Sequence, residues 1–376
     1  MVKNNAIYKT DIFSMTGLLM NLVGTTAVLF TPFSTAVAAK QDGWMGSILA
    51  TVYAAFIIYI VYRLGMLFPD KSLIEYLPLI LGKVAGKILG VLYIIFLFYL
   101  TSSVLREAMA IFLGTGAYKF TPPIVLSIVL VIASTYGLLL GFEVISRTMG
   151  IYLVLIASFY VLTLCLAIPY MKLETLLPMG EAGFANIFKA SLVPFAYRGE
   201  LFLLAMVLPF MKSPREGFIA ANIANILLGI LISFMVLTMI VVLGAETTGR
   251  SIYALFFLAD FIPPIGTKIY LLSFWVVAFW GKIMLLQFII SNGISQLLNL
   301  KSYHYIVIPV GALLVVLSFT FYKNVPDMLI SIPATFPGVA LFFEYLIPTL
   351  LLIIALVKSK FVNNAKPAPA ADNSQS

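Results

Sequence analysis

Charge is scarce in this sequence: only 10% of its 376 residues are Asp, Glu, Lys or Arg, against about 25% in a typical soluble domain. Hydrophobic residues make up 62%, and the mean hydropathy is +1.08. Because so few charges cannot cover so much apolar surface, soluble globular, disordered, collagen-like and nucleic-acid-binding classes are excluded. A polytopic membrane protein remains, and the net charge of +8 becomes a topology signal rather than a polyanion site.

Cysteine and histidine are equally scarce, with one residue of each. A single cysteine, Cys165, excludes an internal disulfide. The single histidine, His304, leaves too few ligands for a structural zinc site, which needs about four. The sequence also has no phosphate-binding loop and no nucleophile–base pair. We therefore expect no metal, no cofactor and no enzymatic activity.

What the sequence has is long apolar stretches, each close to the roughly 20 residues that a spanning helix needs. These stretches are too long for barrel strands, and apolar and polar residues do not alternate along them as they do in such strands. We predict an all-α transmembrane domain over residues 1–360, with halves at 1–168 and 188–358, and a disordered cytoplasmic tail over 361–376. The ten expected spans are 11–36, 43–65, 86–113, 120–141, 144–168, 188–211, 216–244, 267–297, 303–322 and 336–358.

Lysine and arginine set the expected orientation. The first apolar run is too long for a signal peptide, so we interpret it as a retained helix. With a cytoplasmic N-terminus, 13 Lys and Arg residues fall inside and 8 outside, which favours both termini inside. Two connections are too short to span: 72–83 fits a cytoplasmic interfacial helix, and 251–264 fits a re-entrant or lid-like element outside.

The spans that open the two halves are interrupted near their centres. The first contains Gly24, Thr25 and Thr26, and the sixth runs through Pro194 to Glu200. Transporters built from inverted repeats bind substrate between such discontinuous helices, where unwound backbone persists only if protein or a polar ligand satisfies it. The two ends of an amino acid match such a pair of breaks. The alternative is that Gly24 is a packing glycine and Pro194 a simple kink.

Four ionisable residues, Arg198, Glu200, Lys282 and Glu344, lie deep in predicted spans, and the other charges fall at ends and loops. Each costs at least about 2.5–3.5 kcal/mol at the bilayer centre, so such residues are functional candidates. The alternative is that they only hold helices together. We expect Lys282 to pair with Glu200. The third span adds aromatic and hydroxyl side chains, which suit a small polar ligand or ordinary helix packing: Phe98, Tyr99, Thr101, Ser102 and Ser103.

At these residues the chain resembles the B subunits of bacterial spore germinant receptors, in the amino acid–polyamine–organocation superfamily. The resemblance covers roughly residues 8–360, and it rests on the order and spacing of several pieces. These are Lys40-Gln41-Asp42-Gly43-Trp44, Gly199-Glu200 followed by Leu208-Pro209-Phe210, Asn292-Gly293, and Glu344-Tyr345-Leu346-Ile347-Pro348.

The resemblance implies a LeuT-like fold of five plus five helices, with helices 1 and 6 broken, in the spore inner membrane. It implies assembly with a larger A subunit and a lipid-anchored C subunit, and sensing of nutrient germinants, typically amino acids, sometimes with sugars or ions. The ligand-site residues carry over as Gly24, Thr25, Thr26, Phe195, Ala196, Tyr197, Gly199 and Glu200, and more weakly as Phe98 and Thr101. Arg198 and Lys282 match no family motif, and Thr25 stands where a second glycine is usual.

Three hypotheses follow from these observations. The leading one is a ligand-sensing membrane subunit that binds a germinant at the two breaks and signals through partner subunits. The second is a working secondary amino-acid transporter, with Lys282 in place of a coupling cation or Glu200 relaying protons. The third is a scaffold or ion-release element that binds no ligand itself.

Overall fold

Helices build the whole of the described chain. The computed structural model describes residues 9–116, 120–250, 252–261 and 267–364, and within these ranges the only strand-like pairing is one isolated bridge between Thr10 and Met211. The α-helices are α1 (Ile12–Ala39), α2 (Gly43–Leu67), α3 (Leu73–Leu81), α4 (Lys83–Gly114), α5 (Pro123–Leu139), α6 (Phe142–Ala167), α7 (Gly183–Gly199), α8 (Leu204–Val207), α9 (Pro214–Leu243), α10 (Ala245–Thr248), α11 (Ala254–Phe261), α12 (Thr267–Leu298), α13 (Val307–Thr320), α14 (Val325–Ala340) and α15 (Ile347–Asn364).

Seven helical stretches of the described chain are long and apolar enough to cross a membrane, which makes this a multi-pass membrane protein. One of them, Ile12–Leu67, contains both α1 and α2, and two shorter apolar helices, α5 and α13, join the set. Every predicted span therefore coincides with helix. That ten segments cross, in two related halves, stays a prediction. The other long stretches are Lys83–Gly114, Phe142–Tyr170, Gly183–Phe210, Pro214–Leu243, Leu271–Leu298 and Val325–Lys358.

Local sequence signals mark several helix ends. The Asp11 carboxylate accepts the Ser14 N–H at 2.8 Å and caps α1, and the Asn324 side chain accepts the Asp327 N–H at 2.8 Å at the start of α14. Such caps satisfy N–H groups that lack helical partners. The expected interfacial helix is present as α3, which starts with a Ser72 capping box.

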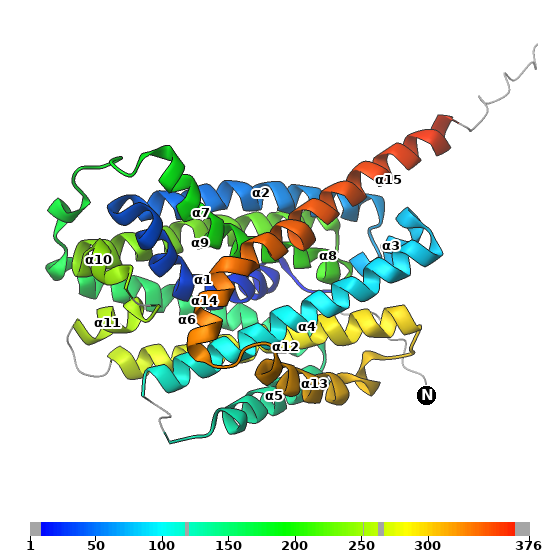
Figure 1. The fold of residues 1–376 in the computed structure, drawn as a ribbon. Helices are drawn as coiled ribbons and strands as arrows, with labels where there is room; N and C mark the ends of the chain where they lie inside the picture. The colour runs from blue at the N-terminus through cyan, green and yellow to red at the C-terminus, as the bar shows by residue number, and fades with distance from the viewer. Residues whose placement is uncertain (1–8, 117–119, 251, 262–266, 365–376) are drawn as a thin grey trace, which may run out of the picture.

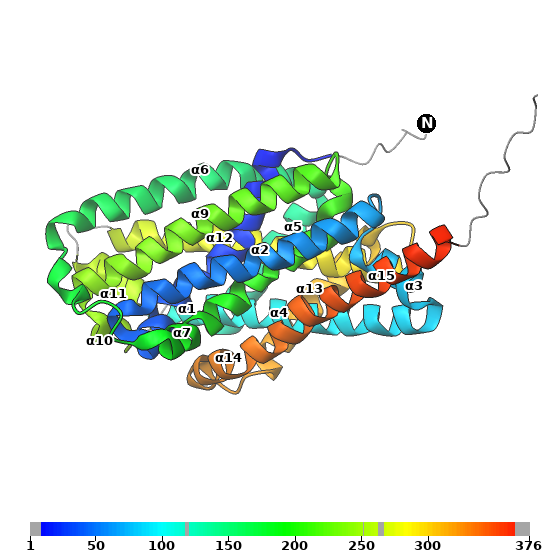
Figure 2. The same ribbon diagram turned by 90° about the horizontal axis from the view of Figure 1, so that it is seen from above.

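Helix α1 forms the centre of the bundle. It packs against α2, α6, α7, α9 and α12, and nearly all of its side chains from Ser14 to Pro32 are buried. Figure 2 shows α6 and α9 on one side of the bundle and α4, α13 and α14 on the other, with α15 projecting beyond the rest. Helices α4 and α12 pack against each other and run side by side in Figure 1. Side chains on α1 therefore meet both α7 and α12.

Contacts at the helix ends agree with the expected sidedness. The Lys9 ammonium donates to the Pro209 carbonyl at 2.7 Å, and the Thr10 and Ser146 hydroxyls are hydrogen-bonded. All four residues lie at ends that the charge bias assigns to the cytoplasmic side. At ends assigned to the outer side, the Asp42 carboxylate accepts the N–H groups of residues 180 and 182 at 2.9 and 3.0 Å.

Two expected segments differ in extent. Helix α15 continues to Asn364, so residues 361–364 are helical rather than part of a disordered tail, because no proline or glycine interrupts the chain between Pro348 and Pro367. Residues 365–376 lie outside the described chain. The expected lid-like element includes α11, which packs against α1, α9 and α12, while 251 and 262–264 of that element lie outside the described residues.

Candidate functional site

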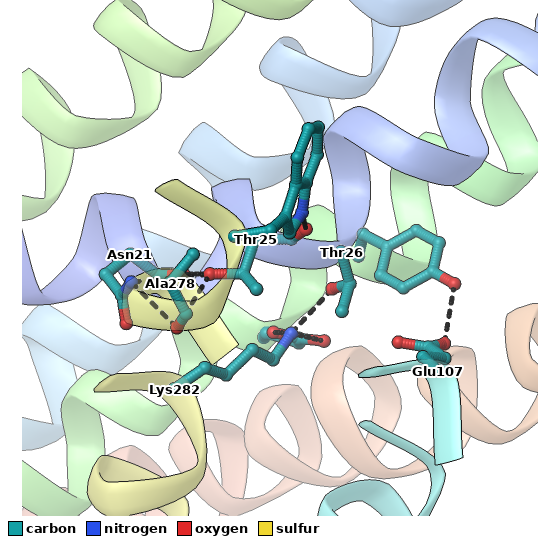
Figure 3. Close-up of polar contacts among 9 residues, drawn as sticks. Asn21, Thr25, Thr26, Glu107, Ala278 and Lys282 are labelled. Carbon is teal, nitrogen blue, oxygen red and sulfur yellow. Dashed lines mark hydrogen bonds and ion pairs between the residues drawn. The ribbon is translucent and has the colours of Figure 1, made fainter. Parts of the chain in front are cut away.

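A fully buried ion pair lies between α1, α7 and α12. The Lys282 ammonium on α12 contacts both Glu200 carboxylate oxygens, at 2.9 and 2.7 Å, and donates to the Thr26 hydroxyl of α1 at 2.6 Å. Both charged side chains have no solvent exposure. Figure 3 shows the Lys282 amine directed at Thr26. The expected Lys282–Glu200 pairing is therefore confirmed.

The pair meets the condition under which a buried ion pair persists. Removing two charges from water is offset only when the geometry is good and the remaining donors and acceptors are satisfied. Here the three ammonium donors have three acceptors, and both Glu200 oxygens are used. Lys282 therefore joins the first helix to the start of the irregular part of the sixth span.

A second polar network joins α1 to α12 one turn away. The Asn21 amide donates to the Ala278 carbonyl at 3.1 Å, and the Thr25 hydroxyl donates to the Asn21 carbonyl at 2.6 Å. The Trp275 indole N–H donates to the Thr25 carbonyl at 3.1 Å. Figure 3 shows Asn21, Thr25 and Ala278 grouped beside Lys282. The carbonyls of this part of α1 are already hydrogen-bonded.

The predicted break in the first span is wrong for this structure. Helix α1 is continuous from Ile12 to Ala39, because its backbone keeps helical partners and Thr25 bonds within the helix. Gly24 faces a neighbouring helix instead: a Cβ there would lie 3.2 Å from the Leu228 side chain. Gly24 is therefore a packing glycine in this structure, the alternative that the sequence left open.

The sixth span is interrupted, but later than predicted. Helix α7 contains Pro194 and ends at Gly199, and the chain tightens into a 3₁₀ turn, η4 (Glu200–Leu203), before α8. A second 3₁₀ turn, η5 (Leu208–Phe210), follows. The interruption is a change of helix type rather than unwound backbone. It places Glu200 at the first residue of the tight turn.

A small cavity adjoins the ion pair between α4, α7, η4 and α14, with a volume of about 10 Å³, which is room for about one water molecule. Glu107 of α4 lies on its wall and is 3% exposed. The Tyr197 hydroxyl donates to Glu107 Oε1 at 3.3 Å, whereas Oε2 has no partner among the described residues. The lining residues are Tyr99, Leu100, Ser103, Val104, Glu107, Tyr197, Glu200, Ile332 and Phe336.

Glu107 and Arg106 correct the sequence analysis, which left both outside the set of four buried charges and so assigned them to ends and loops. Both are buried in α4, and the Arg106 guanidinium lies over the Phe319 ring at 5.0 Å. Their helix is 32 residues long, so its final turns remain among neighbouring helices. The adjacent pair Arg106-Glu107 in an otherwise apolar segment was the available signal.

Arg198 and Glu344 are buried on either side of Gly199 without being paired to each other. Arg198 Nη1 donates to the Asn225 carbonyl and side-chain oxygen, both at 3.0 Å, while Nε and Nη2 have no partner among the described residues. Both Glu344 carboxylate oxygens also lack one there. A Cβ on Gly199 would lie 2.1 Å from Glu344 Oε2, so the acid contacts the end of α7 directly.

Glu344 lies in a π-helical turn, η7 (Leu341–Leu346), between α14 and α15. Pro348 follows four residues after Glu344, so no N–H is available there for the Glu344 carbonyl. Pro333 and Pro337 lie inside α14. π-Helical turns are rare in proteins as a whole, and those that occur are frequently found at functional sites.

The remaining predicted site residues lie apart from the cavity lining. Thr101 donates to the Leu97 carbonyl of its own helix at 2.7 Å, and Phe195 stacks on Tyr345 with ring centroids 4.2 Å apart. Phe98 is half-buried and Ala196 fully buried. The structure thus brings together Thr26, Tyr197, Glu200, Lys282 and Glu107. In the described part of the chain, no group of three or more His, Cys, Asp or Glu residues is arranged to hold a metal ion.

Comparisons with known proteins agree with this architecture. A family model described as "Spore germination protein" matches residues 7–326. Spore germination protein KB of Bacillus subtilis is 26% identical over 349 residues, which cover 89% of this chain and 91% of that protein. Spore germination protein YndE of the same organism is 24% identical over 90% of this chain and 94% of its own length.

Solved transporter structures share the fold. A Na⁺-coupled sialic acid symporter superposes with a TM-score of 0.65 at 13% identity, over 90% of this chain and 80% of that one. The manganese transporter of Eremococcus coleocola superposes with a TM-score of 0.60 at 14% identity, over 98% of this chain and 93% of that one. Mhp1, a nucleobase-cation-symport-1 family transporter, superposes with a TM-score of 0.52 at 12% identity, over 96% of this chain and 94% of that one. These LeuT-fold-like transporters and the germination proteins are not enzymes, which fits a non-enzyme here. With its family model matched over most of its length, the chain belongs to the spore germination protein family.

Proposed function

We propose that this chain is the membrane subunit of a spore nutrient-germinant receptor. It binds a small germinant, an amino acid, beside the Lys282–Glu200 pair and triggers germination through partner subunits. Family membership and a transporter-type fold support this role. The observation that carries it is the buried pair itself, which joins α1 to the 3₁₀ turn η4 next to a cavity whose mainly apolar wall includes the Glu107 and Glu200 carboxyl groups.

The pair gives the bundle a point that a ligand can act on. A ligand shifts a conformational equilibrium only through different affinities for the two states. Here the cavity shares Glu200 with the pair, so an occupant changes the electrostatic surroundings of the link between α1 and η4. Helix packing around Gly199 then changes, and partner subunits receive that change. The proposed partners are the larger A subunit and the lipid-anchored C subunit.

The proposed location is the spore inner membrane, with both termini on the cytoplasmic, core side. The Lys and Arg bias supports this orientation. Contacts between ends of equal expected sidedness support placing both termini on the same side, among them the Lys358 ammonium, which donates to the Ile80 carbonyl of α3 at 2.6 Å.

Spores carrying variants of this chain test the role. Lys282→Met is expected to abolish the fall in optical density after amino-acid addition, because it leaves Glu200 buried without its counter-charge. Lys189→Met, which removes an exposed lysine from α7, is the matched control and is expected to respond normally. Immunoblots of spore membranes establish that both proteins are present. A normal response from Lys282→Met at a normal protein level would contradict the proposal.

The structural neighbours favour one alternative, a working secondary amino-acid transporter coupled to protons or cations, because they are themselves transporters. Purified chain in liposomes discriminates the two. The receptor proposal expects no accumulation of radiolabelled alanine or asparagine by the chain alone, with or without an ion gradient. Robust accumulation would establish the transporter and overturn the receptor.

A non-binding scaffold is the third possibility, and filling the cavity tests it. Val104 is buried on the cavity wall, so Val104→Leu, which adds one methylene group beside the cavity, is expected to block the ligand while the complex still assembles. A complex that assembles and responds normally with the cavity filled would leave the chain as a scaffold.

A further inference from the structure

The cavity wall carries two acidic side chains, and the described residues supply a full set of partners to only one of them. Glu107 and Glu200 both line the cavity, and no lysine or arginine is among its lining residues. Lys282 lies within electrostatic range of both, but its three donors are used by Thr26 and Glu200. Glu107 Oε2 is therefore a buried acceptor without a donor.

A buried carboxyl group in this condition is either protonated or paired with a donor or a cation. An uncompensated charge in a water-excluded site is strongly unfavourable, and buried charges are paired or bound to cations. The Tyr197 hydroxyl supplies a single neutral hydrogen bond, at 3.3 Å. The free acceptor is positioned for a donor that enters the cavity.

The rest of the lining suits a cation that carries N–H donors. Tyr99, Tyr197 and Phe336 present aromatic rings to the cavity, and such rings attract ammonium groups through their negative faces. The Ser103 hydroxyl is bonded to the Tyr322 hydroxyl at 2.9 Å. A bare metal ion would need several converging anionic or carbonyl ligands, and the described chain groups no three candidate side chains for one.

The first helix offers no competing site for an amine. Helix α1 is unbroken, and the Thr25 and Asn21 carbonyls already accept from Trp275 and from the Thr25 hydroxyl. Recognition of an ammonium by unwound backbone of this helix is therefore absent from the described structure. A side-chain carboxylate on α4 takes that role.

The geometry points to Glu107 as the acceptor for the ammonium group of a small organic ligand, which binds when the cavity between Glu107 and Glu200 widens from its present volume of about 10 Å³, with the rings of Tyr99 and Tyr197 around it. This inference rests on the proposed function and adds to it the residue that selects for a primary amine. Inorganic monovalent cations share the charge, so the experiment includes them as a separate arm.

The experiment uses the purified full chain in lipid nanodiscs. Its thermal stability is measured with each of the twenty amino acids, and binding of those that stabilise it is titrated against two isosteres, the 2-hydroxy acid and the acid with a methyl group in place of the amine. The wild-type chain is expected to bind the isosteres at least about tenfold more weakly, since a hydrogen bond to a charged group is lost. Equal binding of amino acid and isosteres would overturn the assignment, and this comparison needs no variant.

Two variants then locate the effect. Glu107→Gln keeps the size of the side chain and removes its charge, and it is expected to weaken amino-acid binding at least about tenfold. Glu174→Gln removes an exposed carboxylate from the loop before α7 and is expected to bind as the wild type does. Unchanged affinity in folded Glu107→Gln would overturn the assignment.

The ion arm separates the two sources of charge. Ammonium chloride and potassium chloride are added alone, at matched ionic strength, to the wild-type chain and to Glu107→Gln. One outcome is that either salt stabilises the wild-type chain but not Glu107→Gln, while no amino acid stabilises it. The cavity would then bind an inorganic cation, and the proposal of an organic ligand would be overturned. If amino acids and their isosteres bind equally well, the assignment of Glu107 is wrong, but the proposed function stands. Failure of every amino acid to bind, with normal germination of spores that lack the chain, removes the proposed function as well.

Discussion

The first and sixth spans carry the same sequence signal, a glycine amid small or polar residues at mid-membrane, and the structure treats them differently. Gly24 lies in a continuous helix with a neighbouring side-chain methyl 3.2 Å from its Cβ position, whereas the Cβ position of Gly199 is 2.1 Å from a buried carboxylate. The helix type changes directly after Gly199. A glycine marks close approach in both places, and only its neighbours decide whether the helix is interrupted.

The link between these two helices should be the most sensitive to mutation. Glu200→Gln alone is expected to lower the free energy of unfolding by about 3–5 kcal/mol, because Lys282 is left as a buried charge without its partner. The double variant Glu200→Leu with Lys282→Met should recover most of that loss, since apolar replacements of a buried pair are often nearly neutral. Unfolding in mixed micelles measures both. A single variant as stable as the wild type would show that the pair does not join the helices energetically.

Gly199 should tolerate a methyl group poorly. Gly199→Ala places Cβ against Glu344 Oε2 and the Tyr345 ring, at 2.1 and 2.5 Å, and overpacking of this kind costs about 1–3 kcal/mol. Adding Glu344→Ala removes one of the two obstacles and should restore part of the stability. The same micelle assay gives the values, and a loss below about 0.5 kcal/mol would mean that the contact yields easily.

Glu344→Gln should change stability by less than about 1 kcal/mol, or increase it. Neither carboxylate oxygen has a hydrogen-bond partner among the described residues, so the substitution removes a burial cost without breaking a pair. This result would distinguish Glu344 from Glu200, which is equally buried but paired. A loss as large as that of Glu200→Gln would reveal a partner that forms in another state of the bundle.

Gly24→Ala should have the smallest effect, within about 0.5 kcal/mol of the wild type. Alanine favours a continuous helix over glycine by about 1 kcal/mol, which offsets the close contact with the flexible end of Leu228. Helicity by circular dichroism and unfolding in micelles check this. A large loss would indicate that α1 must open at Gly24 for the protein to be stable.

The sequence predicted the helices well because apolar length alone determines where a chain can cross a bilayer. It also predicted the Lys282–Glu200 pair, since two opposite charges deep in a bundle gain most by meeting. It did not predict the intact first helix, because the packing of Gly24 depends on which side chain of α9 faces it. Glu107 was missed as a buried acid because it lies near the end of the predicted span 86–113, next to Arg106, where a charged pair is also typical of a helix end at the membrane surface.

The π-turn was also beyond the sequence pattern. Prolines at 333, 337 and 348 are compatible with a kink, a bend or a widened turn, and the choice depends on how Glu344 fits against Gly199. The Tyr93 hydroxyl donates to the Phe343 carbonyl at 2.9 Å. A partner on α4, 250 positions away in the sequence, thereby occupies a carbonyl of the turn.

That widened turn sets the rotational phase of everything after it. Each residue of an α-helix advances the side-chain direction by about 100°, so a turn holding one residue more than the α-helical count rotates α15 by about that angle relative to α14. The face of α15 that meets α2 and α3, including the Lys358 ammonium on the Ile80 carbonyl, is therefore determined by the length of residues 341–346 as much as by their chemistry. The number of residues in this one turn therefore determines how the last helix is rotated relative to the buried Glu344 carboxyl group.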